Sequence, residues 1–152
     1  MFSPDRFSEP TRRWFADSFP HATDAQLRGW DAIEAGAHTL IHAPTGSGKT
    51  LAAFLWSIDQ LAHESPPAPA QRCRVLYISP MKALAYDIEK NLRVPLAGIQ
   101  AEAERLGTPL SPITTAMRTG DTPQPERRTM LRTPPDILIT TPESLYLMLT
   151  SR

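Results

Sequence analysis

The chain has 152 residues, of which 41% are hydrophobic and 21% are charged, and its 16 basic residues balance its 16 acidic ones. A chain of this length buries enough surface for one compact domain. Sixteen prolines are about twice the usual share, but glycine is scarce, so the composition excludes a disordered chain. The zero net charge excludes broad electrostatic attraction to nucleic acid, and any such binding must be local.

Neither a membrane span nor a secretory leader is expected. No stretch approaches the roughly 18 apolar residues that a span requires, and the first ten residues mix charges with prolines where a signal peptide has an apolar core. The single cysteine, Cys73, excludes an internal disulfide and a multi-cysteine metal site. The predicted location is the reducing cytoplasm.

Hydrophobic periodicity predicts helices that alternate with strands. The expected helices cover about Glu9–Phe19, a segment capped near Thr23 or Asp24 and stopped by Gly36, a segment after Gly48 with an apolar stripe from Leu51 to Ala62, Lys82 to about Leu106 with a break or restart at Pro95, Pro125–Arg132, and Pro142–Leu149. The expected strands are His38–His42, Arg74–Ile78, Ile113–Met117 and Asp136–Thr140. This order predicts an α/β fold with a doubly wound, mostly parallel sheet, whose ligands bind at the carboxyl ends of the strands.

The strongest local signal is the segment Ala43-Pro44-Thr45-Gly46-Ser47-Gly48-Lys49-Thr50, between an expected strand and an expected amphipathic helix. Gly46 and Gly48 allow backbone conformations in which consecutive amides point inward and form an anion nest. Lys49 can extend along the β- and γ-phosphates, and the Thr50 hydroxyl can coordinate a bridging Mg²⁺. The first residue is alanine where the strict motif has glycine, and an extended alanine before proline finishes the strand. The segment predicts a nucleotide-binding P-loop.

Further motifs surround this loop. Gln26 precedes it, and the segments Tyr77–Leu84, Arg118–Thr122, Glu126–Arg128 and Pro134–Leu145 follow it. Together they resemble superfamily 2 helicases, and within them the large helicase-related (Lhr) family of bacterial ATP-dependent helicases. The resemblance runs from about Phe7 to the last residue. It implies a RecA-like P-loop NTPase fold and a motor that couples ATP hydrolysis to movement along nucleic acid and to its unwinding.

The resemblance also implies roles for individual residues. Gln26 matches the helicase Q motif, in which a glutamine amide pairs with adenine, and the implied cofactors are ATP and Mg²⁺. Ala43, Pro44, Thr45, Gly46, Ser47, Gly48, Lys49 and Thr50 would bind the nucleotide, with Lys49 catalytic and Thr50 on the metal. Nucleic-acid contacts are implied for Ser79, Pro80, Lys82, Arg118, Thr141, Pro142 and Glu143. The implied track is single-stranded nucleic acid, namely DNA, with an RNA–DNA hybrid as an alternative.

Free amides at a helix N-terminus suit such contacts. Thr141 as N-cap and Pro142 at the first helical position leave amides that can hold a phosphate without adding net charge. Arg118, Arg127 and Arg128 are interpreted equally well as added phosphate contacts or as a solvated face.

An ATP-hydrolysing motor also needs a later acidic element, usually Asp-Glu at the end of a strand, and no adjacent pair of that kind is found. The chain is therefore expected to be an N-terminal piece that works with the remainder of a helicase chain. Residues 1–36 would form a helical lead-in, and residues 37–152 the N-terminal part of the first motor domain. Two alternatives stay open: a non-catalytic nucleotide- or nucleic-acid-binding module, and another P-loop enzyme such as a small-molecule kinase.

Overall fold

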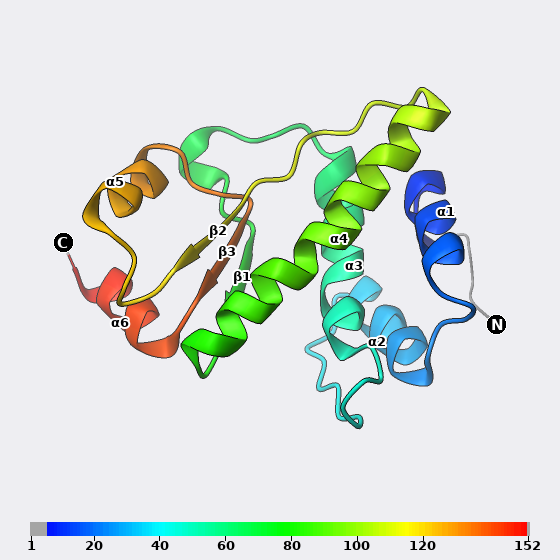
Figure 1. The fold of residues 1–152 in the computed structure, drawn as a ribbon, viewed down its shortest axis with the longest axis horizontal. Coiled ribbons are helices and arrows are strands. Elements are labelled where there is room, and N and C mark those ends of the chain that lie inside the picture. The colour runs from blue at the N-terminus through cyan, green and yellow to red at the C-terminus, as the bar shows by residue number, and fades with distance from the viewer. Residues whose placement is uncertain (1–5, 152) are drawn as a thin grey trace. The chain divides into compact units, whose positions relative to one another are not determined.

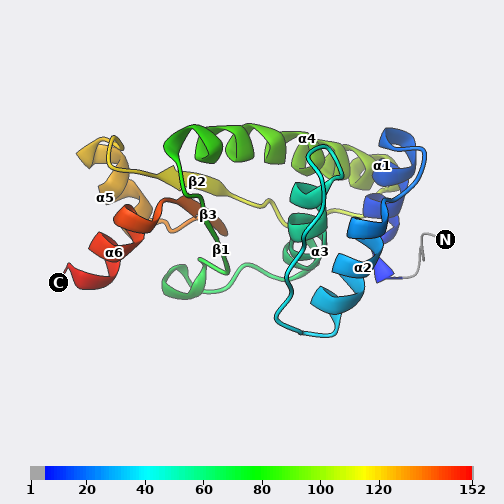
Figure 2. The ribbon, with the colours of Figure 1, turned by 90° about the horizontal axis from the view of Figure 1, so that it is seen from below.

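A computed structural model describes residues 6–151 of the chain. These residues form two compact units. The first comprises the described part of Met1–Glu64 together with Pro95–Leu110, and the second comprises Ser65–Val94 together with the described part of Ser111–Arg152. Figures 1 and 2 show the helices and strands of both.

The first unit is built from helices. It contains α1 (Glu9–Ser18), α2 (Asp24–Glu34), α3 (Lys49–His63) and the later part of α4 (Lys82–Leu106). Helices α2 and α3 lie beside each other (Figures 1 and 2). Trp30 of α2 is fully buried, and the rings of Phe7 and Phe15 approach it edge-on with centroids 5.0 and 5.6 Å away. Such edge-to-face packing of large rings supplies much of the burial that holds a small helical unit together.

A buried carboxylate joins α1 to α3. Asp59 of α3 is 3% exposed and accepts hydrogen bonds from the Ser8 Oγ at 2.5 Å, the Thr11 Oγ1 at 2.6 Å and the Ser8 backbone N–H at 3.2 Å. A negative group at the N-terminus of a helix accepts hydrogen bonds from the free N–H groups there and interacts favourably with the helix dipole. The expected lead-in helix is therefore fixed to the helix that begins at Lys49.

A glycine of α4 makes room for an aromatic ring of α1. A Cβ atom built on Gly98 would lie 2.2 Å from both Cδ1 and Nε1 of the Trp14 indole, which is itself buried. No side chain fits at such a distance, so Trp14 packs directly on the backbone of the helix at this point.

The second unit is a three-stranded parallel sheet with helices. Its strands are β1 (Val75–Ile78), β2 (Thr115–Arg118) and β3 (Ile137–Thr140), in the spatial order β1-β3-β2 (Figure 1). The register pairs Val75 and Thr115 with Ile137, so the three carboxyl ends lie at one edge. The helices are the first part of α4, α5 (Gln124–Arg132) and α6 (Pro142–Thr150), with a 3₁₀ turn at Pro69–Gln71. The predicted α/β class with a parallel sheet is confirmed.

Asp136 holds the amino ends of the strands. Its carboxylate is 2% exposed and accepts hydrogen bonds from the Thr114 N–H and Oγ1, both at 2.8 Å, and from the Arg72 guanidinium at 3.2 Å. Arg74 adds a further ion pair at 3.5 Å. Burial alone would raise the pKa of this carboxyl, but the Thr114 and Arg72 contacts outweigh burial and hold the pKa below its usual value.

One predicted strand is wrong. Residues His38–His42 are extended, but in the part of the chain that the structure describes they pair with no strand, and Leu40 is 93% exposed. The apolar pattern gave the correct extended backbone, whereas a strand also needs a neighbour that takes its N–H and C=O groups. The three paired strands all belong to the other unit.

The predicted break at Pro95 is also wrong, because α4 continues through that residue from Lys82 to Leu106. Proline removes one helical hydrogen bond but does not by itself end a helix that packing supports on both sides of it. The boundary between the two units falls at the same residue. The expected division into residues 1–36 and 37–152 refers to a motor domain of the longer protein. It stays a prediction, because the two compact units have other boundaries.

The other elements match their predicted positions within two residues, and the stop at Gly36 is confirmed by its φ of 72°. Within residues 6–151, no helix has both the length and the apolar character that a membrane span requires.

Replacing Asp136 by asparagine is expected to lower the free energy of unfolding by about 2–3 kcal/mol, because two guanidinium groups lose their charged partner. Since the folded-state pKa is depressed, this contribution is present above the unfolded-state pKa of about 3.9 and is lost as the pH falls through the folded-state value. Denaturant unfolding of the whole protein between pH 3 and 7 measures both effects. Asp87→Asn, an exposed position of α4, is the matched control, and equal losses for the two variants would contradict the assignment.

Candidate functional site

The predicted P-loop forms a tight turn between the extended segment and α3. Gly46 and Gly48 have φ values of 83° and 78°, the left-handed region that favours glycine, and Gly48 is the N-cap of α3. The Ser47 N–H donates to the Pro44 carbonyl at 3.3 Å and closes the turn. The prediction that both glycines adopt conformations that side chains disfavour is confirmed.

Helix α2 holds this loop from one side. The Thr23 hydroxyl donates to the Ser47 carbonyl at 2.8 Å, and the Gln26 amide Nε2 lies 3.5 Å from the Gly48 carbonyl. In a planar trans peptide the N–H points opposite to the C=O. The Gly48 carbonyl also accepts the Ala52 N–H of α3 at 2.9 Å. The Gly48 N–H therefore points away from the Thr23 hydroxyl, and the Lys49 N–H points away from the first turn of α3. This is the arrangement of an anion nest at a helix N-terminus.

Gln26 is 4% exposed and has two local tasks. Its Oε1 accepts from the Thr23 N–H at 2.9 Å, while the Thr23 hydroxyl accepts from the Gln26 N–H at 3.3 Å, which together form a capping box at the start of α2. Sequence reasoning placed the cap near Thr23 but missed its bond to Ser47. The Thr-x-x-Gln spacing is the signal for the box, whereas the bond to the loop has no local signal.

The lysine of the loop lies over its backbone. Lys49 Nζ donates to the Ala43 and Pro44 carbonyls, both at 2.6 Å. The Ser47 Oγ is buried and has no hydrogen-bond partner among the described residues, and Thr50 is half-buried in the first turn of α3. The loop thus gathers an ammonium group, aligned amides and hydroxyls, which is the donor set that polyphosphates take. Within residues 6–151, no group of three or more acidic, histidine or cysteine side chains is placed to hold a metal ion.

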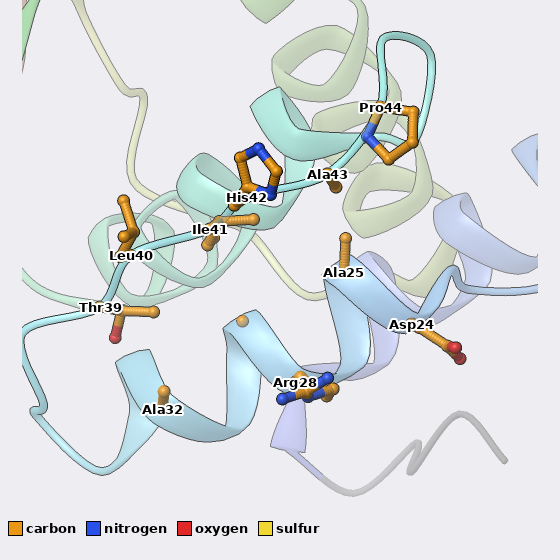
Figure 3. Close-up of a pocket in the computed structure, with 11 residues that line it drawn as sticks. Asp24, Ala25, Arg28, Ala32, Thr39, Leu40, Ile41, His42, Ala43 and Pro44 are labelled. Atoms are coloured by element: carbon orange, nitrogen blue, oxygen red, sulfur yellow. The ribbon is translucent and has the colours of Figure 1, made fainter.

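A pocket of about 450 Å³ lies between α2 and the extended segment that leads into the loop (Figure 3). Its wall includes Asp24 and Arg28 of α2, with Ile41, Ala43 and Pro44 opposite them. It includes only two residues of the predicted nucleotide site, and Gln26 is not among its lining residues. The pocket is therefore distinct from the concave side of the P-loop.

The predicted nucleic-acid residues lie in the second unit, at the carboxyl ends of its strands. The Ser79 N–H donates to the Thr140 carbonyl at 2.8 Å, and the Thr140 hydroxyl donates to the Arg118 carbonyl at 2.6 Å. These two bonds bring together the ends of β1, β3 and β2. Thr141 caps α6 by accepting from the Ser144 N–H at 3.4 Å, with Pro142 at the first helical position, so the predicted N-cap is confirmed.

The side chains at this edge differ in their exposure to solvent and in their hydrogen bonds. Ser79 is fully buried, and its hydroxyl donates to the Met81 carbonyl at 2.9 Å. Pro80, Pro142 and Glu143 are exposed. Lys82, the first residue of α4, is half-exposed and forms an ion pair of 2.6 Å with Asp121, which sequence reasoning missed.

Two arginines lie near the end of β2. Burial, and after it the charge of Arg127, lowers the pKa of the Arg118 guanidinium, although an arginine stays protonated at neutral pH. Arg127 donates to the Thr122 and Gly120 carbonyls, both at 2.8 Å. Arg127 thus holds the turn after β2 in place through these hydrogen bonds. The interpretation of Arg127 as part of a solvated face did not include them.

The sequence model of one family, the DEAD/DEAH box helicases, matches residues 23–152. The chain belongs to the DEAD/DEAH box helicase family. This confirms the RecA-like α/β helicase fold and the helicase resemblance inferred from the motifs.

Within the family, the chain is similar to Lhr helicases. It is 59% identical over 146 residues to the Lhr helicase/probable uracil glycosylase of Mycolicibacterium smegmatis, and 50% identical over 154 residues to the Lhr helicase/uracil glycosylase of Escherichia coli. These matches cover 96% and 98% of this chain but only 10% of each relative. The chain therefore spans about a tenth of the length of these relatives.

The solved structure of an Lhr helicase has the same fold as this chain. The Mycobacterium smegmatis helicase Lhr bound to ssDNA and AMP-PNP superimposes with a TM-score of 0.89 and 58% identity, over 96% of this chain and 18% of that one. The DUF1998 helicase MrfA bound to DNA and AMPPNP, at 24% identity and a TM-score of 0.74 over 94% of this chain and 18% of that one, shares the fold.

Gly48→Ala tests the close contact between the loop and α2. The variant strains a backbone with φ of 78° and places a Cβ atom 2.4 Å from the Gln26 amide nitrogen. Gly36→Ala is the matched control, because it has a similar φ of 72° and its Cβ would meet nothing within 4 Å in the described part of the chain. We expect a loss of about 1 kcal/mol in unfolding free energy for the control and a distinctly larger loss for Gly48→Ala.

In a Gln26→Ala background, Gly48→Ala should cost less than in the parent protein, since the smaller side chain leaves room for the new methyl group and the loss of the capping box is common to both Gln26→Ala proteins. Denaturant unfolding of the whole protein measures the single variants and the double variant. Equal losses for the two glycine variants would show that α2 does not hold the loop as described.

Proposed function

We propose that the chain is the front part of the first motor domain of an ATP-dependent helicase, which couples ATP binding and hydrolysis to movement along nucleic acid and to its unwinding. The observation that carries this proposal is the P-loop turn at the N-terminus of α3, in which Gly48 is the N-cap and the Thr23 hydroxyl of the neighbouring segment donates to the Ser47 carbonyl. Family membership supports the motor class. The activity belongs to the whole protein, with the remainder of the helicase chain as the partner that completes the site.

The residues of the loop fit a triphosphate. The aligned amides, the Lys49 ammonium and the orphaned Ser47 hydroxyl offer donors to phosphate oxygens. To reach them, Lys49 would exchange the Ala43 and Pro44 carbonyls for anionic oxygens, which are stronger acceptors for an ammonium group. Residues 43–50 as a whole would form the cradle.

The nucleotide and its metal ion would also contact Gln26 and Thr50. The Gln26 amide would meet adenine, for which it would give up or share its contacts with Thr23 and Gly48. The Thr50 hydroxyl would hold Mg²⁺, which supplies charge neutralisation to the phosphates when bound. No adjacent Asp-Glu pair occurs in the sequence, so the acidic partner for that metal would come from the remainder of the helicase chain. The AMP-PNP in the Mycobacterium smegmatis Lhr structure supports a nucleotide ligand for the whole protein.

Lys49→Ala in the whole protein is expected to reduce ATP hydrolysis at least about 100-fold and to abolish ATP-driven strand separation, because the loop loses its point charge for the β- and γ-phosphates. Lys90→Ala is the control, since it removes an exposed lysine of α4. Steady-state ATPase and unwinding assays measure both variants. Unwinding that persists in Lys49→Ala would refute the motor proposal.

The carboxyl edge of the sheet would contact the track. Lys82, Arg118 and the amides at the start of α6 would meet strand phosphates, and Ser79, Pro80, Thr141, Pro142 and Glu143 would shape the edge along which the strand lies. The ssDNA in the Mycobacterium smegmatis Lhr structure supports single-stranded DNA as the track, and an RNA–DNA hybrid is a second candidate. The cytoplasm remains the proposed location, on the ground of the lone cysteine.

Lys82→Ala is expected to weaken single-stranded DNA binding by the whole protein roughly three- to ten-fold at low salt and to make binding less dependent on salt, because one phosphate contact is lost. Fluorescence anisotropy with a labelled oligonucleotide at several salt concentrations measures this. Lys90→Ala serves again as the charge-matched control, and identical binding of the two variants would remove Lys82 from the interface.

A further inference from the structure

One ion pair stands at the proposed track-binding edge. Lys82 follows β1 as the first residue of α4, and Asp121 lies in the turn after β2. Their Nζ and Oδ2 atoms are 2.6 Å apart, and the two side chains are 50% and 69% exposed. Because β1 and β2 are both parallel to β3, the pair lies at the edge where the strands end.

The turn that carries Asp121 is fixed by hydrogen bonds. The Thr119 N–H donates to the Thr122 Oγ1 at 2.9 Å, the Thr122 N–H returns to the Thr119 carbonyl at 3.2 Å, and the Asp121 N–H donates to the Thr119 Oγ1 at 3.3 Å. Thr119 and Thr122 are buried. Arg127 clamps the same turn from α5 through the Thr122 and Gly120 carbonyls. The backbone therefore holds the Asp121 carboxylate beside Lys82.

The stability of the fold does not explain the pairing of Lys82 with Asp121. An exposed ion pair contributes little to folding, because solvent screens the charges and both side chains lose freedom. The ion pair instead changes how strongly Lys82 can bind an anion. An ammonium group paired with a carboxylate presents no net charge to a polyanion, and a phosphate that approaches must displace the carboxylate or lie close to it.

We propose that Asp121 competes with strand phosphates for Lys82 and thereby weakens the grip of this edge on single-stranded nucleic acid. The proposal rests on the track-binding role of Lys82 proposed above. A motor must release its track in each cycle, and a competing carboxylate built into the sheet edge lowers affinity at one contact without removing the cation. Asp121 is thus a residue that sets the affinity for the track and is not a catalytic residue.

The test uses Asp121→Asn in the whole protein. Asparagine keeps the shape of the side chain and the backbone bond to Thr119, so the turn is retained. We expect single-stranded DNA to bind about two- to five-fold more tightly at low salt, with the gain shrinking as salt rises and screens the carboxylate. Asp87→Asn is the matched control, an exposed position of α4 in the same unit. Anisotropy titrations measure binding, and thermal unfolding verifies that both variants are folded.

A double-mutant cycle with Lys82→Ala separates competition from general charge repulsion. If Asp121 acts through Lys82, Asp121→Asn gives no gain in the Lys82→Ala background. An equal gain in both backgrounds, or a gain equal to that of Asp87→Asn, would overturn the proposal.

The same cycle distinguishes this proposal from the proposed function. If Lys82→Ala weakens binding but Asp121→Asn does not strengthen it, the track contact stands and the competition fails. If Lys82→Ala leaves binding unchanged, Lys82 is not a track contact and both statements about it fail.

Discussion

The proposed nucleotide site depends on the contact between the start of α2 and two consecutive carbonyls of the P-loop. Thr23 takes the carbonyl of Ser47, and Gln26 lies against that of Gly48. Peptide planarity then fixes the direction of the next two amides. Thr23 and Gln26 also cap α2 through each other, so one pair of side chains starts a helix and orients the loop beside it. The helical segment before the loop is in this sense part of the proposed nucleotide site, and Asp59 extends the connection to α1.

The sheet unit follows a different principle at its two ends. At the amino end, the buried Asp136 carboxylate contacts two guanidinium groups and the N–H and hydroxyl of Thr114, and these contacts tie three strands together. At the carboxyl end, the hydroxyls of Ser79, Thr140 and Thr141 bond to nearby groups, and the Lys82–Asp121 ion pair is between exposed side chains. The charged contacts at the amino end are buried and stabilise the fold, whereas the charged contact at the carboxyl end is open to solvent.

The sequence predicted what local rules determine. Glycine spacing identified the P-loop, and the Thr-Pro step identified the cap of α6 at Thr141. The strand predicted at His38–His42 failed because pairing depends on a neighbour that no local pattern reveals. Asp59, the Thr23 bond to the loop and the pair between Lys82 and Asp121 join residues 24 to 51 positions apart, and only the fold brings them together.

The packing of Trp14 on Gly98 constrains how this sequence can diverge. A larger residue at position 98 has no room while the indole is present, and a smaller residue at position 14 alone would leave a hole over the helix backbone. Substitution at either position is tolerated only when the other changes with it. Among relatives that keep α1 against this helix, the two positions should therefore have evolved as a pair.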